Sequence, residues 1–81
     1  MQTFPDKWVQ HEKLTRKVKT ADFVSAVELI NKICEISEKH NHHPNLCLDN
    51  YNELTIEVYT HDAQKITEKD IALANELEKL L

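Results

Sequence analysis

Three histidines lie close together in the segment HNHHP, residues 40–44, and a further histidine stands at position 61. An imidazole titrates near neutral pH, so a histidine can donate or accept a proton under cellular conditions. Two imidazoles beside one bound molecule can protonate a leaving group and remove a proton elsewhere. The sequence therefore predicts acid–base chemistry, provided that the fold brings these side chains together.

Two other interpretations of the histidines remain open. Histidines in loops are often exposed and have no function, and we interpret His11 and His40 in that way. A zinc site would need three or four ligands in a tetrahedral arrangement. No cysteine is suitably spaced for such a site, and no HExxH motif is present, so no metal is predicted.

The segment before the histidines predicts a helix over residues 20–40, with Thr20 as its N-cap and Asp22 in its first turn. Pro44 cannot continue this helix and favours an extended backbone at the residue before it. Neighbouring residues of an extended segment point in opposite directions, so His42 and His43 should have different roles.

The predicted helix has a broad apolar face. Its stripe at helical spacing consists of Phe23, Ala26, Val27, Ile30, Ile33, Cys34 and Ser37. Leu29 and Ile36 widen the stripe beyond what one sheet face can cover. These additional apolar residues indicate either a contact between subunits or the edge of the same core.

The remaining segments predict strands and one more helix. Alternation and turn residues favour strands at 8–12 and 14–19, and a hairpin over 45–60 with its turn at 49–52. A helix is predicted over 67–81, where Thr67 and Asp70 approximate a capping box and Ile71, Ala74, Leu77 and Leu81 form the buried stripe. The order β-β-α-β-β-α predicts an α+β fold, a four-stranded antiparallel sheet with both helices packed on one face. If the last strand is central, its end lies beside the end of the first helix, and His61 faces the histidine cluster across a small cleft.

The composition sets further limits. A chain of 81 residues favours a single domain, 1–81, with a thin core that oligomerisation would support, so a homodimer or homotetramer is expected. The net charge of −4, without a basic cluster, argues against a nucleic-acid partner. No signal peptide or apolar run of membrane length is present, which predicts a cytoplasmic protein with no membrane partner. Cys34 and Cys47 are expected to be reduced and to act as small buried or half-buried hydrophobic residues.

The spacing of several polar residues resembles the active-site signature of the pterin-4a-carbinolamine dehydratase family. The residues are Glu38, the run His42-His43-Pro44, Tyr51, His61 and Asp70. The segment THDAQKITEKDIALA, residues 60–74, is also similar to that family's Thr-His loop and the start of its following helix. The resemblance covers about residues 8–81.

The resemblance implies a dehydratase that removes water from 4a-hydroxytetrahydropterin, the product of aromatic amino-acid hydroxylases. The product would be quinonoid dihydropterin, in the recycling of tetrahydrobiopterin, and no metal or organic cofactor would be needed. His42 and His61 would be the acid–base residues, and His43 would bind substrate and share base duty. Asp70 would bind substrate, cap its helix or orient His61.

The resemblance leaves the roles of two residues open, and it also allows a second function. Glu38 would hold a histidine or close the last helical turn, and Tyr51 would wall the pocket or anchor the hairpin. The family fold also serves as a dimerisation cofactor of a transcription factor and as an assembly chaperone. Relatives of the chaperone type tend to lose the histidines, and this chain keeps them, which favours the enzyme.

Overall fold

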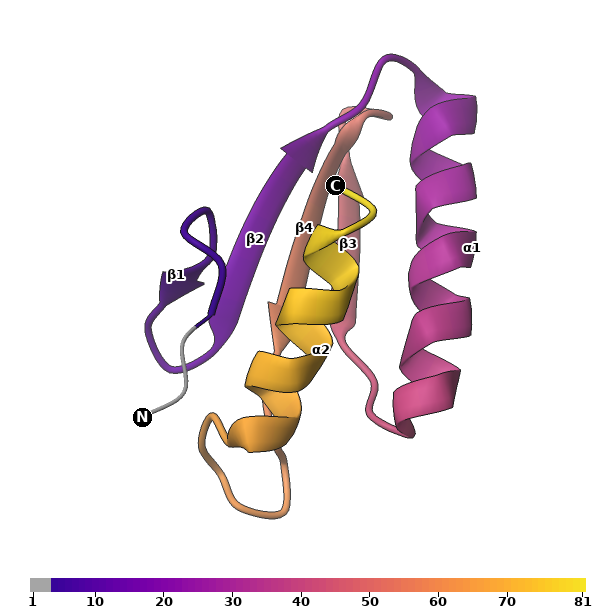
Figure 1. Cartoon of the computed structure of the whole chain (residues 1–81). Coiled ribbons are helices and arrows are strands. Elements are labelled where there is room, and N and C mark those ends of the chain that lie inside the picture. Colours follow the sequence, from indigo (N-terminus) through magenta and orange to yellow (C-terminus); the bar gives the residue numbers. More distant parts are fainter. Residues whose placement is uncertain (1–3) are drawn as a thin grey trace.

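Alternating apolar residues and two amphipathic segments build a four-stranded antiparallel sheet and two helices within residues 4–81, the part of the chain that this computed structural model describes (Figure 1). The first three residues of the predicted domain 1–81 lie outside that range. The elements are β1 (Val9–Gln10), β2 (Leu14–Lys19), α1 (Phe23–His40), β3 (Asn45–Asp49), β4 (Glu53–Val58) and α2 (Glu68–Glu78). The strand order is β1-β2-β4-β3, so β4 is an inner strand and the predicted α+β fold is confirmed.

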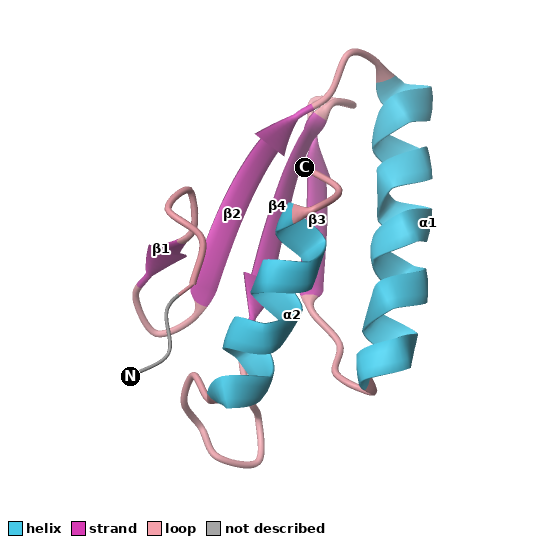
Figure 2. Cartoon of the chain, viewed as in Figure 1, coloured by secondary structure: helices cyan, strands magenta, loops and turns pink. Residues whose placement is uncertain are grey.

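One face of the sheet is covered and the other is open. Period-two alternation buries Leu54, Ile56 and Val58 of β4 against the helices and leaves the intervening residues on the open face. Figure 2 shows α2 lying across the sheet, with α1 beside it, next to β3. Contacts of α2 with β2, β4 and α1 join the two layers around one core.

Strand β1 is shorter at both ends than the predicted strand 8–12, because Trp8 turns into the core and residues 11–13 form the bend that leads to β2. Its indole Nε1 donates to Glu78 Oε1 at 2.9 Å. Glu78 also accepts hydrogen bonds from the buried Arg16, with Nε–Oε1 at 3.0 Å and Nη2–Oε2 at 3.3 Å. This network fastens the end of α2 to the sheet and to the segment before β1.

Helix α1 begins two residues later than its predicted N-cap Thr20 would allow. The N-cap is Asp22, whose Oδ1 accepts a hydrogen bond from the Ser25 backbone N–H at 2.7 Å. That hydrogen bond lowers the pKa of Asp22. Thr20 is held by the sheet instead, since its backbone N–H donates to the Asn52 carbonyl at 2.8 Å.

The buried face of α1 is rotated relative to the predicted stripe. Ala26, Ile33 and Ser37 are buried, and Leu29 and Ile36 pack half-buried against the core. The two widening residues therefore form part of the same core. Phe23 and Val27, on the other edge of the stripe, are exposed, and so is Val24, which lies outside the stripe.

The prediction that both cysteines are buried or half-buried is wrong. Cys34 is exposed because it lies one helical step beyond the buried Ile33, on the edge of the stripe that the core does not cover. Cys47 is exposed because it points to the open face of β3, between the half-buried Leu46 and Leu48. The negative charge of Asp49 raises the pKa of the Cys47 thiol.

Helix α2 is held mainly by its first turn and its apolar side. Thr67 is the N-cap and closes a capping box with Asp70, as predicted. The buried residues of the helix are Asp70, Leu73, Ala74 and Leu77. Leu73 was missing from the predicted stripe, and Ile71 is only half-buried, because α2 packs against both the sheet and α1.

The substitution Glu78→Gln is expected to lower the free energy of unfolding by about 1–3 kcal/mol at pH 7 and by much less in acid. The hydrogen bonds from Arg16 lower the pKa of Glu78 from its ordinary value of 4.5. Because the folded pKa is the lower one, the unfolded chain binds more protons as the pH falls below about 4.5. The stabilisation is therefore complete above that pH and is lost as the pH falls through the folded pKa.

Urea titrations of both proteins at pH 7 and pH 3 measure this difference. The matched control is Glu76→Gln on the same helix, whose partner Lys79 is solvent-exposed, and it should change stability little at either pH. An equal loss at both pH values for Glu78→Gln would contradict the electrostatic explanation.

Candidate active site

The loop after α1 and the loop after β4 lie at the same end of the sheet, where α2 begins (Figure 1). Helix α1 ends at His40, and the left-handed backbone of its C-cap Asn41 (φ 49°) reverses the chain without glycine. The backbone N–H of His42 then donates to the carbonyl of the buried Ser37 at 3.2 Å. This hydrogen bond and the Asn41 cap fix the position at which the histidine pair leaves the helix.

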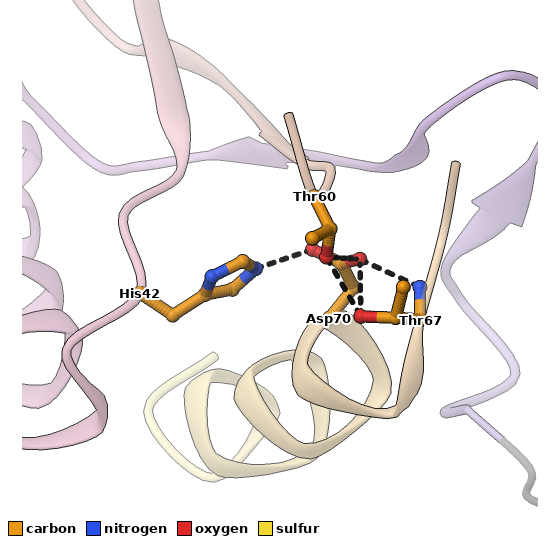
Figure 3. Close-up of polar contacts among 4 residues, drawn as sticks. All are labelled: His42, Thr60, Thr67 and Asp70. Atoms are coloured by element: carbon orange, nitrogen blue, oxygen red, sulfur yellow. Dashed lines mark hydrogen bonds and ion pairs between the residues drawn. The ribbon is translucent and has the colours of Figure 1, made fainter. Parts of the chain in front are cut away.

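The side chain of His42 points inward and binds the start of α2 (Figure 3). Its Nε2 lies 2.6 Å from Oδ1 of Asp70, and its side chain is only 13% exposed. Asp70 itself is fully buried. Its second oxygen, Oδ2, accepts hydrogen bonds from the Thr60 hydroxyl at 2.6 Å and from the Thr67 backbone N–H at 2.8 Å. The carboxylate is thus the shared centre of three chain segments.

His43 points away from this centre, as expected for neighbouring residues of an extended segment. Its Nε2 lies 2.5 Å from Oε2 of Glu38, and its side chain is 60% exposed. Glu38 is on the last turn of α1 and is also exposed. Of the two positions that the sequence left open for Glu38, the structure has the one in which its carboxylate contacts a histidine, His43.

His61 lies in the exposed loop that follows β4. Its ring meets Tyr59 edge to face, with 5.5 Å between the ring centroids. It lines a pocket of about 740 Å³, whose other lining residues are Gln10, His11, Glu12, Tyr59, Gln64, Lys65 and Ile66. His42 and His43 are not among the residues that line this pocket. The segment after β4 is connected to His42 by hydrogen bonds, because the Thr60 hydroxyl binds Asp70 and Asp70 binds His42.

Asp70 therefore contacts His42 and not His61, the partner that the sequence suggested. Thr60 was missed altogether as a site residue, although it directly precedes His61 and reaches Asp70 by its hydroxyl. The signal available in the sequence was its parity, because Thr60 continues the alternation of the buried Leu54, Ile56 and Val58. His11, interpreted as an ordinary surface residue, is exposed but shares the pocket of His61.

Tyr51 lies apart from the three histidines within one chain. It occupies the turn between β3 and β4 with a left-handed backbone (φ 56°), and 62% of it is exposed. The histidines lie at the opposite ends of these two strands. The structure thus places Tyr51 where it shapes the hairpin, and it does not bring Tyr51 to the site.

Two further features are absent from the described part of the chain. Within residues 4–81, no three side chains of histidine, cysteine, aspartate or glutamate are grouped as a metal site requires. Neither helix in this part of the chain has the length and apolar character needed to cross a membrane.

Comparison with known proteins gives one consistent family. A family model described as pterin 4 alpha carbinolamine dehydratase matches residues 1–80. A protein of Acidobacterium capsulatum named "Putative pterin-4-alpha-carbinolamine dehydratase" is 36% identical over 81 residues, which are 100% of this chain and 87% of that protein. A protein of the same name from Picosynechococcus sp. is 35% identical over 77 residues, or 95% of this chain and 83% of that protein.

A solved structure has the same fold. It is described as a transcriptional coactivator/pterin dehydratase from Brucella melitensis, and it matches with a TM-score of 0.83 and 29% identity. The match covers 93% of this chain and 82% of that one. The chain thus shares the α+β architecture of this solved pterin dehydratase. The chain belongs to the pterin-4a-carbinolamine dehydratase family.

Proposed function

We propose that this protein removes water from 4a-hydroxytetrahydropterin and releases quinonoid dihydropterin. The observation that carries the proposal is the pairing of His42 with the fully buried Asp70, next to the strand end that bears His61. An imidazole held by a buried carboxylate has a fixed orientation, which proton transfer in a defined direction requires. Membership of the family supports this choice of substrate.

The chemistry needs one acid and one base. The bond between ring carbon 4a and its hydroxyl oxygen breaks, and the acid protonates that oxygen so that it leaves as water. A proton on a ring nitrogen passes to the base, and the electron pair of its N–H bond forms the new double bond, so the step is redox-neutral. His42 and His61 are the acid–base pair in this proposal, and His43, held by Glu38, binds substrate and shares base duty.

The test is the decay of synthetic 4a-hydroxytetrahydropterin with purified protein, measured against buffer and against heat-unfolded protein. The native protein is expected to accelerate the decay in proportion to its concentration, since each positioned acid or base contributes about 10²–10⁴-fold in rate. Decay no faster than in buffer would remove the enzymatic proposal and leave only the family membership.

A protein-binding function is the second candidate, and a surface observation favours it. Phe23, Val24 and Val27 form an exposed apolar strip at the start of α1. The Brucella melitensis relative is described as a transcriptional coactivator as well as a pterin dehydratase. The same strip would equally serve a homodimer or homotetramer, and light scattering of the purified protein would separate a homo-oligomer from a monomer that awaits a partner. The cytoplasmic location and the role in tetrahydrobiopterin recycling stay predictions.

A further inference from the structure

The arrangement of the hydroxyl protons around Asp70 follows from the shortest contacts there (Figure 3). Thr67 Oγ1 is 3.5 Å from Asp70 Oδ2, too far to compete with its 2.7 Å contact to Thr60 Oγ1. Thr60 Oγ1 donates its single proton to Asp70 Oδ2 at 2.6 Å. Thr60 Oγ1 also lies 2.7 Å from Thr67 Oγ1, so in that contact Thr67 is the donor. With the Thr67 backbone N–H added at 2.8 Å, Oδ2 is filled by donors. The other oxygen, Oδ1, is then left for His42.

The contact between Asp70 Oδ1 and His42 Nε2 needs one proton between the two atoms. Two lone pairs repel at 2.6 Å, so either the carboxyl or the ring nitrogen carries that proton. Both oxygens of Asp70 act as hydrogen-bond acceptors in this arrangement, as those of a carboxylate do, so Nε2 is the donor in the contact with Oδ1. A neutral imidazole has only one N–H, so the lone pair of His42 is then on Nδ1. Within residues 4–81, no hydrogen-bond partner of Nδ1 is present.

We propose that Asp70 and Thr60 are positioning residues that hold His42 as the Nε2-protonated tautomer. If the protein is the dehydratase proposed above, on which this step rests, His42 exchanges a proton with the substrate through Nδ1. Thr60 also links the two acid–base candidates. Its hydroxyl binds Asp70, the partner of His42, and it directly precedes His61 in the chain. Its backbone N–H donates to the Lys65 carbonyl at 3.2 Å, which holds this position in the loop.

The tautomer of His42 can be measured without any enzymatic assay. Two-bond ¹H–¹⁵N spectra at alkaline pH distinguish the two neutral forms, and His42→Gln assigns the signals. The wild type is expected to show the Nε2–H form. In Asp70→Asn, the amide oxygen is expected to face the Thr60 hydroxyl and the Thr67 N–H, so the amide NH₂ faces Nε2 of His42. Because Nε2 must then accept a hydrogen bond, the Nδ1–H form is expected. A wild-type Nδ1–H form, or an unchanged tautomer in Asp70→Asn, would overturn the proposal.

Turnover tests the role of Thr60. Thr60→Val is expected to lower kcat about tenfold with KM changed less than about twofold, and Thr60→Ser is expected to restore kcat, because only the hydroxyl is needed. The control is Thr55→Val on the open face of β4, which should have wild-type kcat. Wild-type kcat in Thr60→Val would refute the role of Thr60, as would failure of a folded Thr60→Ser to recover. If the wild type has no dehydratase activity, both the proposed function and proton transfer through Nδ1 are refuted. The spectra still show which tautomer His42 adopts.

Discussion

Replacement of His61 by alanine is expected to lower dehydratase kcat by about 10²–10⁴-fold and to leave the fold intact. The large kinetic effect is expected because His61 is one of the two acid–base candidates. The small structural effect is expected because His61 is exposed in a loop, where its ring meets that of Tyr59 edge to face. Steady-state kinetics with 4a-hydroxytetrahydropterin measure the first effect, and thermal unfolding measures the second.

A matched histidine and a chemical rescue sharpen this experiment. His40 is exposed at the end of α1 and has no proposed role, so His40→Ala should keep wild-type turnover. Because His61 lines an open pocket of about 740 Å³, free imidazole has room to enter the His61→Ala variant and to recover part of its activity. Normal turnover in His61→Ala would remove the acid–base role of His61 but not the dehydratase proposal itself.

The elements of this fold could be predicted from local patterns because each pattern matches a local physical cause. Strands β2 and β4 alternate with period two, and the predicted second strand, 14–19, agrees with β2 as observed. Pro44 and the capping box at Thr67 mark element ends by backbone chemistry that needs no tertiary information. The same reasoning predicted that His42 and His43 point in opposite directions, and the structure gives them different partners and exposures.

What the sequence could not provide was the choice of partner across the fold. Asp70 lies closer in sequence to His61, yet it pairs with His42, because the packing of α2 beside α1 sets that distance. The exposure of Cys34 has a similar origin. A helical stripe shows which residues are apolar, whereas the tilt of α1 against the sheet decides which edge of the stripe is buried.

The substitution Asp70→Ala is expected to lower the free energy of unfolding by about 3–5 kcal/mol. The side chain is fully buried, and its removal leaves the imidazole of His42, the Thr60 hydroxyl and the Thr67 N–H without their acceptor. A chain of 81 residues has a total stability of about 4–12 kcal/mol, so this single change would remove a large part of it. Urea unfolding followed by circular dichroism measures the loss.

Two further variants show whether the loss comes from the buried network. Asp62→Ala removes a carboxylate from the exposed loop after His61 and should change stability by less than about 0.5 kcal/mol. Asp70→Asn keeps an acceptor oxygen for Thr60 and Thr67, so its stability should lie between those of the wild type and Asp70→Ala. Because Asp70→Asn preserves much of the packing but reverses the hydrogen bond to His42, a folded Asp70→Asn protein with low kcat would separate the positioning of His42 from the stability of α2. If Asp70→Ala lost less than about 1 kcal/mol, Asp70 would not be the shared anchor of these three segments.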